Sequence, residues 1–384
     1  MPFHHPAADI LPRYVQVIDG ALEMAGSGAS HTHIYPATGQ ATTTIQMSGT
    51  ADLDRACAAA RKAAPAWRAM AGDKRRDLMF KLAAMLESQA ADMAPILTAE
   101  NGSIVIAGPH MSYDAAQKFR YFGGWADKVE GRTVATWGGP AHDYVAYEPY
   151  GTIGIIVPWN GPLFAATMVM APALAAGNCV VIKSPELAPC SVMRLVELIH
   201  QAGFPNGVVN LVTGAGDLGA AMVSHPQIDK IEFIGSGATA TKILTNAAQS
   251  LKPVGLELGG KSAVLVFADA NLQDAAKRGL SGAVSANGQG CVNGTRLLVE
   301  RAIYEPYIQM LAAMAAHVTI GDPFAMDCFM GPVISATALA RISGMVSRGV
   351  ASGARLICGG AKLGGDHAGG YYLPITILAD VSPD

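Results

Sequence analysis

From Thr152 onward, short apolar runs alternate with segments of helical composition, and this alternation constrains the fold of the 384-residue chain more than any other feature. The four runs are TIGIIVP, CVVIK, GVVNLVT and DKIEFIG. Strands this apolar are buried on both faces, and the connections between them are right-handed crossovers. The pattern predicts an α/β fold with a Rossmann-type parallel sheet. Ligands of such sheets bind at the carboxyl ends of the strands, which here follow Val157, Ile182, Val212 and Ile234.

A second α/β region is predicted after this sheet. It begins with the strand SAVLVF and continues with a helix from about Asn271, the strand RLLVE and the helical segment YEPYIQMLAAMAAH. Two more strand candidates, ARLIC and YYLPITIL, follow. Their β-branched and aromatic content favours strands.

The first part of the chain carries different signals. Residues 1–50 are expected to be irregular with short β-like pieces. A helix is predicted from Thr50 as N-cap, with a kink or an end at Pro65, and a second amphipathic helix is predicted over residues 73–93. The segment RTVATWGGPAHDYVAYEPYG predicts a β-hairpin, because two β-prone runs flank Gly-Gly-Pro.

Composition excludes several classes of function. Charged residues make up 15% of the chain and the net charge is −3, so no nucleic-acid or anionic-membrane partner is expected. The uncharged stretch between Glu148 and Lys183 is broken by proline and glycine, which favours buried core over a membrane span. The six cysteines form no CxxC pair and no metal site is predicted, and the N-terminus has no secretory pattern. These features favour a reducing, cytoplasmic location.

Three strand ends carry candidate cofactor ligands. Lys183 and Glu186, in KSPE, suit the hydroxyls of a ribose, and Ser236 after Gly235 suits a pyrophosphate at a helix N-terminus. Taken singly, each has a plainer interpretation: solvated surface charges for Lys183 and Glu186, and a helix cap for Ser236. The segment GAGDLG also matches a dinucleotide fingerprint, but a tight strand-to-helix turn is the favoured interpretation.

Two residues have the chemistry of a catalytic pair. Glu257 lies between two leucines in LELGGK, and apolar surroundings would raise its pKa, as a general base requires. The alternative is a buried glutamate held by backbone amides. Cys291 lies in NGQGCVNGTR, a polar, glycine-rich segment unlike the apolar surroundings of most unpaired cysteines. It is either a nucleophile or packing material.

The segments VPWNGPL, KSPELAP, FIGS, LELGGK and GQGC occur in this order, followed by an arginine. Together they resemble the signature set of the NAD(P)-dependent aldehyde dehydrogenase superfamily. RYFGGWADKVEGRTV is similar to the same family's segment between substrate tunnel and oligomerisation hairpin. The resemblance implies an NAD-binding domain in residues 1–128 and 150–258, an oligomerisation hairpin in 129–149 and a catalytic domain in 259–384.

The resemblance also implies roles for individual residues. Cys291 matches the nucleophile, Glu257 the general base and Asn160 the oxyanion-hole amide, so that an aldehyde is oxidised through a cysteine thiohemiacetal and thioester. The implied cofactor is NAD, with NADP possible; Glu186 near the ribose favours NAD. The implied cofactor-binding residues are Ile156, Trp159, Lys183, Glu186, Gly235 and Ser236. The implied substrate-tunnel residues are Trp125, Phe164, Met168, Gly290 and Val292, and Lys128 matches a residue sometimes assigned to proton relay. A homodimer or homotetramer is implied.

The chain departs from the family pattern at several positions. Ala240 stands where the cofactor helix has its second glycine, and Ala238 where a glutamate is frequent. Gly161 replaces a frequent phenylalanine, and Ser285 and Ala286 replace an aromatic and an amide residue. The first two differences are expected to weaken cofactor binding, and the others to reshape the tunnel.

Members of the family continue beyond the equivalent of the last residue here into an ExFGP segment. The expectation is therefore a C-terminally incomplete catalytic domain with impaired turnover. The alternatives are a dinucleotide-binding or structural protein without catalysis, and a cysteine-dependent ester or thioester hydrolase that needs no cofactor.

Overall fold

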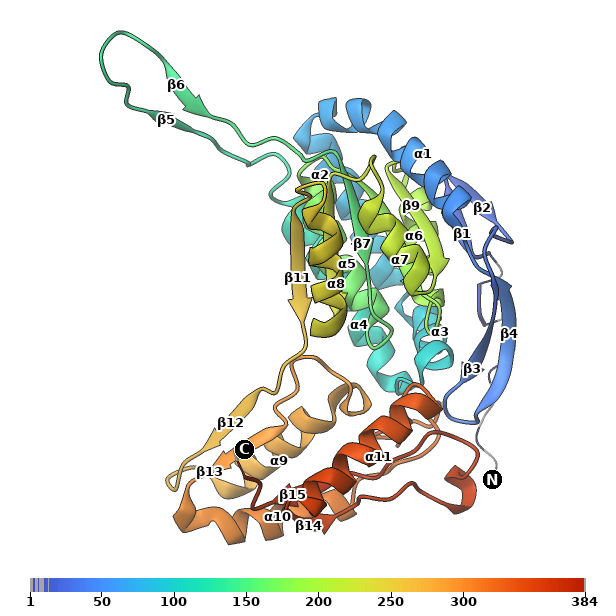
Figure 1. The fold of residues 1–384 in the computed structure, drawn as a ribbon, viewed down its shortest axis with the longest axis vertical. Helices are drawn as coiled ribbons and strands as arrows, with labels where there is room; N and C mark the ends of the chain where they lie inside the picture. Colours follow the sequence, from blue (N-terminus) through green and yellow to red (C-terminus); the bar gives the residue numbers. More distant parts are fainter. Residues whose placement is uncertain (1–2, 4–5, 7–9, 13, 383–384) are drawn as a thin grey trace.

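The computed structural model describes Phe3, Pro6, residues 10–12 and residues 14–382, and within them seven strands form one central sheet (Figure 1). Their spatial order is β11-β10-β7-β8-β9-β1-β2. The strands are β1 (Gln16–Ile18), β2 (Ala21–Glu23), β7 (Thr152–Ile156), β8 (Cys179–Pro185), β9 (Val209–Gly214), β10 (Lys230–Gly235) and β11 (Val254–Leu258).

The predicted parallel sheet is confirmed. β7 to β11 pair in parallel, and every residue of β7, β8 and β9 is buried, as their apolar sequences require. β8 lies on one side of β7 and β10 on the other, so the strand order reverses between β7 and β10. A reversal of this kind opens a crevice outside the carboxyl ends of the strands, where ligands of α/β sheets bind.

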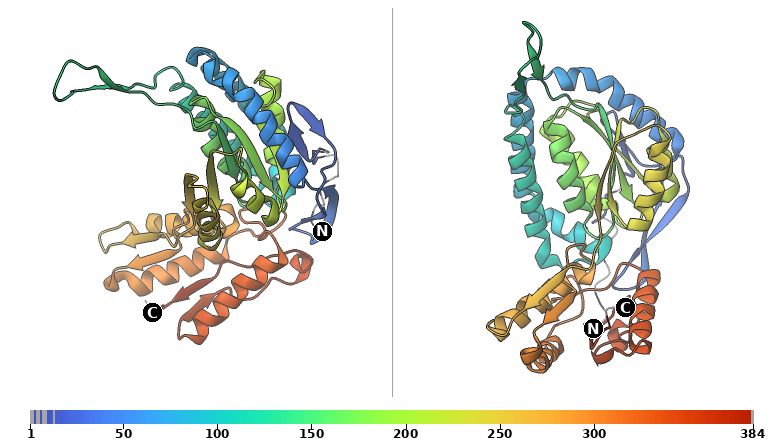
Figure 2. Two further views of the ribbon diagram at one scale, coloured as in Figure 1. Left: turned by 45° about the horizontal axis from the view of Figure 1, so that its top comes forward. Right: turned by 60° about the vertical axis from the view of Figure 1, so that its left-hand side comes forward.

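Helices cover both faces of the sheet (Figure 2). α5 and α6 pack on one face and are backed by α2, α3 and α4, whereas α1, α7 and α8 pack on the other. Their bounds are α1 (Thr50–Ala69), α2 (Gly72–Ser88), α3 (Ala90–Asn101), α4 (Gly108–Gly123), α5 (Pro162–Ala175), α6 (Cys190–Ala202), α7 (Gly216–Ser224) and α8 (Gly237–Ala248). The GAGDLG segment forms the turn from β9 into α7.

The predicted end of the helix at Pro65 is wrong, whereas a kink there stays a prediction. α1 continues through Pro65 to Ala69. Trp67, just beyond the proline, is fully buried and its ring lies 5.6 Å from the ring of Phe204. Tertiary packing supplies most of the stability of a helix in a protein, so the buried Trp67 offsets the main-chain hydrogen bond that Pro65 cannot make.

Two helix boundaries also differ from the prediction. α1 begins with Gly49 rather than Thr50 as N-cap, because the carboxylate of Asp52 accepts a hydrogen bond from the Gly49 main-chain N–H at 2.9 Å. The helix predicted over residues 73–93 is divided at Gln89 into α2 and α3. Its predicted apolar face is nevertheless buried, with Leu82 and Leu86 in the core.

The first 50 residues contribute the predicted short strands. β1 pairs antiparallel with β9, so it extends the central sheet. β3 (Ser30–Tyr35) and β4 (Gln40–Gln46) form a separate hairpin.

The second α/β region has its own small core of aliphatic residues and Tyr307. Its strands β12 and β13 are parallel, and α9 and α10 pack together. The elements are β12 (Ala263–Val266), α9 (Leu272–Val284), β13 (Arg296–Val299), α10 (Tyr304–Ala316), α11 (Ala336–Ala351), β14 (Arg355–Cys358) and β15 (Ile377–Ala379). β15 is shorter than the predicted strand YYLPITIL, and α11 was not predicted. One-turn 3-10 helices span Val105–Ala107, Ser285–Gly288, Arg301–Ile303 and Gly365–His367.

Two surfaces of the chain are unusually apolar. Leu265, Phe267 and Leu298, on or beside β12 and β13, are exposed, whereas Val264, Val266 and the other alternate residues pack against the second core. The predicted hairpin is present as β5 (Arg132–Val134) and β6 (Asp143–Val145) and projects far from the body (Figure 1).

Among the described residues, no helix combines the length and the apolar character that crossing a membrane requires.

Candidate active site

Cys291 differs from the other five cysteines in its surroundings. It is exposed, whereas Cys57, Cys179, Cys190 and Cys328 are buried and Cys358 is half-buried. Burial raises the pKa of each of these five thiols, to about 12 for Cys57 and Cys179. Because the thiolate is the reactive form, burial disfavours reaction at these five sites. Cys291 is therefore the thiol best placed to meet a substrate.

The backbone before Cys291 makes a sharp turn. The helix α9 ends at Val284, and Ala286, Asn287 and Gly288 then adopt left-handed dihedrals, with φ of 51°, 55° and 73°. A residue with a Cβ atom costs about 1–2 kcal/mol in this conformation. The glycines of this loop were predicted to allow a sharp turn. It was not predicted that Ala286 and Asn287, which carry a Cβ atom, also adopt left-handed dihedrals.

Asn160 lies beside this loop. It follows the carboxyl end of β7 and precedes α5, and its side-chain Nδ2 donates to the main-chain carbonyl of Gln289 at 2.8 Å. Gln289 is two residues before Cys291, and its own Oε1 accepts from the Ile334 main-chain N–H at 3.0 Å. The structure thus brings two of the three predicted catalytic segments together.

Glu257 does not have the predicted environment. It lies near the carboxyl end of β11, opposite Ile234 of β10, and it is exposed rather than buried between leucines. Side chains alternate along a strand, so Val254 and Leu256 pack on the core while Glu257 faces the other side. β11 is also the outermost strand of the sheet, and no strand in the described part of the chain pairs with its outer edge. The prediction of an apolar environment for this carboxylate is wrong.

The segment after Glu257 is nonetheless hydrogen-bonded to the segment after Cys291. Nε of Arg296 donates to the main-chain carbonyl of Lys261 at 2.6 Å, and Nζ of Lys261 donates to Oγ1 of Thr295 at 3.3 Å. The third predicted catalytic segment therefore joins the same region through its neighbours.

Lys183 is buried, with 5% of its surface exposed, so the solvated-surface interpretation is wrong for this residue. Its Nζ donates to the main-chain carbonyls of Ser184, at 3.3 Å, and Gly214. Burial lowers the pKa of Lys183, and the negative charges of Glu186 and Asp217 oppose that shift. An ammonium group held at the strand ends with one donor to spare is suited to a polar ligand. Glu186 is half-buried nearby.

Gly235 and Ser236 lie where β10 ends and α8 begins. Ser236 is the N-cap, and its Oγ accepts from the Thr239 main-chain N–H at 3.3 Å, so the helix-cap interpretation is correct for this side chain. A Cβ at Gly235 would meet the ring of Phe233 at 2.4 Å, so glycine is required there for close packing. Apart from its chain neighbours and its own helix backbone, no described atom lies within 4 Å of the position that a Cβ at Gly237 would occupy, so the helix N-terminus is open.

The remaining predicted site residues lie around the same strand ends. Ile156 is buried at the end of β7, and Trp159 packs on the cluster that contains Val333 and Ile334 of the second region. Phe164 and Met168 are on α5, and Nζ of Lys118 lies 3.9 Å from the centre of the Phe164 ring.

Two predicted tunnel residues flank Cys291, and two predicted residues lie after α4. Gly290 packs against Asn293, and Val292 is exposed. Trp125 is half exposed, and Nζ of Lys128 donates to the main-chain carbonyl of Gly124 at 2.9 Å.

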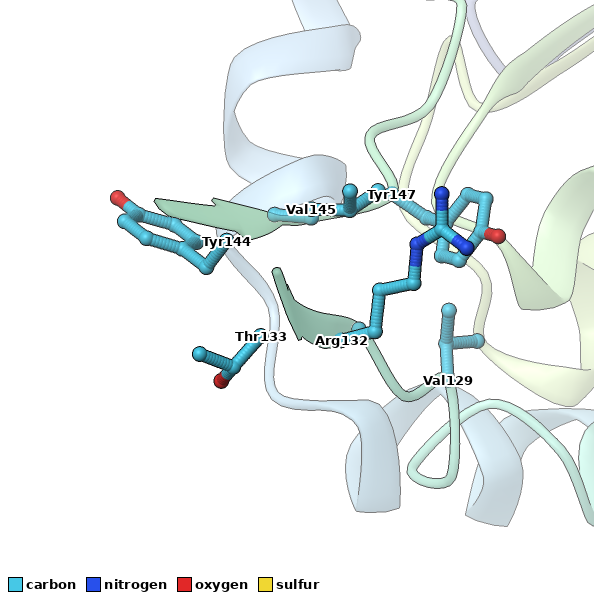
Figure 3. Close-up of a pocket in the computed structure, with 8 residues that line it drawn as sticks. Val129, Arg132, Thr133, Tyr144, Val145 and Tyr147 are labelled. Atoms are coloured by element: carbon cyan, nitrogen blue, oxygen red, sulfur yellow. The ribbon is translucent and has the colours of Figure 1, made fainter. Parts of the chain in front are cut away.

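A separate surface hollow lies on the projecting hairpin. Val129, Arg132 and Tyr147 are among the residues that line it (Figure 3). It contains none of the predicted catalytic or cofactor residues. It is a feature of the hairpin and not of the site around Cys291.

The order of the segments around Cys291 can now be compared with known proteins. A sequence model of the aldehyde dehydrogenase family matches residues 24–384. The chain belongs to the aldehyde dehydrogenase family. An aldehyde dehydrogenase from Alternaria alternata is 40% identical over 371 residues, which cover 96% of this chain and 74% of that protein.

Solved structures of aldehyde dehydrogenases have the same fold. A mutant aldehyde dehydrogenase from Bacillus cereus is 32% identical and has a TM-score of 0.94, over 100% of this chain and 79% of its own. Betaine aldehyde dehydrogenase from Staphylococcus aureus, solved with NAD+, is 30% identical with a TM-score of 0.93, over 96% of this chain and 76% of its own. The family resemblance and the fold predicted from the sequence are confirmed.

Three residues that hold the site in place were not predicted: Asn101, Asn287 and Gln289. Their side-chain amides bond to main-chain groups of other segments. Two of them stand beside glycines in NGQGC, and a cluster of amides among glycines is the signal that would have identified them.

Proposed function

We propose that this aldehyde dehydrogenase oxidises an aldehyde to its carboxylic acid with NAD+, through a thioester on Cys291. The observation that carries the proposal is the hydrogen bond from the Asn160 side chain to the Gln289 carbonyl. It places an amide donor from the strand ends of the sheet beside the loop of an exposed thiol. A thiol beside a hydrogen-bond donor is the minimal arrangement for acyl-transfer chemistry.

The chain's own residues have the following roles. The thiolate of Cys291 adds to the aldehyde carbon, so that a C–S bond forms and the carbonyl oxygen becomes an oxyanion. The Asn160 amide and the Cys291 main-chain N–H donate hydrogen bonds to that oxygen. The C–H bond of that carbon then breaks, and its hydride would leave to the nicotinamide that a bound cofactor would supply, so that the thioester remains. Glu257 takes a proton from the water that attacks the thioester carbon, and the C–S bond breaks to release the acid and the thiolate.

The strand ends fit the cofactor. The buried ammonium of Lys183 and the carboxylate of Glu186 suit ribose hydroxyls, and the open N-terminus of α8 at Ser236 suits a pyrophosphate. Ile156, Trp159 and Gly235 complete the proposed cofactor site. A carboxylate beside the ribose disfavours a 2′-phosphate, which supports NAD+ over NADP+. The Staphylococcus aureus relative was solved with NAD+.

The proposal extends to the organisation of the chain. Residues 1–128 and 150–258 form the cofactor-binding domain, residues 259–384 the catalytic domain, and residues 129–149 an oligomerisation arm. The exposed aromatic side chains of this arm support a homodimer or homotetramer. The six unpaired cysteines support a cytoplasmic location.

The substrate reaches Cys291 along a tunnel in this proposal. Its walls are Trp125, Phe164, Met168, Gly290 and Val292, and its apolar side chains suit an apolar aldehyde.

One observation favours a second candidate, a protein that binds the dinucleotide without turning over an aldehyde. Glu257 is exposed on the outermost strand of the sheet, where bulk water competes with a catalytic water molecule for its carboxylate.

A panel of aldehydes assayed with NAD+ and NADP+ tests both candidates. Formation of NADH that requires an aldehyde and is lost in Cys291→Ser supports the oxidation. NAD+ binding without turnover supports the second candidate. Hydrolysis of esters that requires Cys291, together with neither aldehyde-dependent NADH formation nor NAD+ binding, would contradict both.

A further inference from the structure

The left-handed turn before Cys291 needs support from outside its own backbone. Ala286, Asn287 and Gly288 are consecutive and all left-handed, and residues with a Cβ rarely remain in that region unless the surrounding structure holds them. A contact with another segment must therefore hold this loop in place.

The side chain of Asn287 makes that contact. It is buried, and its Nδ2 donates to the main-chain carbonyl of Gly102 at 2.8 Å and to that of Pro332 at 3.0 Å. Its Oδ1 accepts from the Gly331 main-chain N–H at 2.8 Å. Both donors and one acceptor site of the amide are thus used on two segments outside the loop, and Gly102 is 185 residues away in sequence.

The same turn at the end of α3 also holds the segment that carries Asn160. Asn101, next to Gly102, donates from Nδ2 to the main-chain carbonyl of Trp159 at 3.2 Å. Its Oδ1 accepts from the N–H and the hydroxyl of Ser103, at 3.0 and 2.6 Å, which fixes the amide. Adjacent residues of one turn therefore bond to the neighbour of Asn160 and to the loop of Cys291.

We propose that Asn287 is a positioning residue for the addition of the Cys291 thiol. It acts through the loop: by binding Gly102, it keeps the main-chain N–H of Cys291 and the side-chain amide of Asn160 directed at one oxygen position. This inference rests on the proposed aldehyde oxidation. Because geometric errors of an ångström strongly reduce catalysis, release of the loop affects turnover before it affects the fold.

The test is Asn287→Asp, which keeps the shape of the side chain but removes both donors and sets a carboxylate against two carbonyls. Asn178→Asp is the matched control. Asn178 is also buried, its Nδ2 donates to the Ala173 carbonyl at 3.1 Å, and its Oδ1 accepts from the Gly151 N–H at 3.0 Å. It lies at the amino ends of β7 and β8, opposite the site.

Hydrogen exchange by mass spectrometry and steady-state kinetics are measured on both variants. In Asn287→Asp, exchange of peptides within residues 285–293 is expected to rise about tenfold, since a buried hydrogen-bonding amide is lost. The value of kcat is expected to fall by roughly 10²-fold, with KM for NAD+ within about twofold of the unsubstituted protein. In Asn178→Asp, faster exchange is expected near its own partners, with kcat retained.

Unchanged exchange in residues 285–293, or a kcat equal to that of the control, would overturn the positioning role while aldehyde oxidation stands. Absence of aldehyde-dependent NADH in the unsubstituted protein would overturn the proposed function and the inference together. If the aspartate variant does not fold, Asn287→Gly gives the same readouts, because glycine adopts the left-handed conformation freely and lacks the amide.

Discussion

The side-chain amide of Asn160 lies 2.8 Å from the main-chain oxygen of Gln289, and this one bond connects the central sheet to the loop of the exposed thiol. The two residues are 129 positions apart. They come from the two α/β regions of the chain, so the site lies where these regions meet.

The first prediction concerns Asn160. Asn160→Ala removes the proposed donor to the oxyanion, so kcat is expected to fall by about 10²–10³-fold. The dissociation constant for NAD+ is expected to stay the same, as measured by calorimetry. Asn178→Ala, the loss of a buried amide at the other end of the strands, serves as control and keeps kcat per folded molecule. Equal kcat values in the two variants would exclude an oxyanion role.

The second prediction concerns cofactor binding. Lys183→Met removes a buried ammonium from the strand ends, and the dissociation constant for NAD+ is expected to rise at least about tenfold. Lys252→Met is the control. Nζ of Lys252 also donates to two main-chain carbonyls, those of Val223 and His225, at 2.6 and 2.8 Å. The proposed ribose contact is wrong if both variants bind NAD+ as tightly as the unsubstituted protein.

The third prediction is a pH dependence of stability. Glu100 is buried at the end of α3, where its carboxylate accepts from the Ser191 N–H at 2.9 Å. Burial raises the pKa of Glu100 from 4.5 to about 7, against the hydrogen bonds from Ser191 and Cys190. The native state therefore holds a proton that the unfolded state releases between these two pH values. The free energy of unfolding falls by roughly 3 kcal/mol as the pH rises through this window.

Glu100→Gln removes this titration. Chemical denaturation at several pH values between about 4.5 and 7 is expected to show a flatter profile for the variant. Glu197→Gln, in which a more exposed carboxylate of α6 is replaced, is expected to keep the slope of the unsubstituted protein. Parallel profiles for Glu100→Gln and the unsubstituted protein would show that Glu100 does not cause the slope.

The fourth prediction concerns assembly. Trp137 and Tyr144 on the hairpin are exposed, Trp137 by 98%. Replacement of both by aspartate is expected to reduce the mass in light scattering to that of one chain, because charges at an apolar contact are costly to bury. Leu251→Asp, at an exposed apolar residue outside the hairpin, is expected to leave the assembly intact. A mass that is the same with and without the hairpin substitutions would place the contact elsewhere.

Much of the fold is encoded in local sequence. The strands β7, β8 and β9 are predictable because a strand buried on both faces is largely apolar, whereas β10 also contains the half-buried Lys230 and Glu232. Cys291 is also identifiable from local sequence, because its polar neighbours distinguish it from the buried thiols.

Other features depend on contacts between distant segments. The surroundings of Glu257 are set by the position of β11 at the sheet edge, which no local pattern encodes. The continuation of α1 past Pro65 depends on the packing of Trp67 against Phe204. The attachment of β1 to the sheet rests on its pairing with β9, almost 200 residues later, where Val17 faces Leu211.

The bond between Gly102 and Asn287 has a consequence for how the protein folds. A contact across 185 residues can form only after both segments have their own structure, and such contacts are closed late and slowly. During synthesis, every strand of the central sheet is made before Cys291, because the last of them in the chain, β11, ends at Leu258. The nascent chain thus contains the strands of the proposed dinucleotide-binding surface before Cys291, the proposed nucleophile, is added.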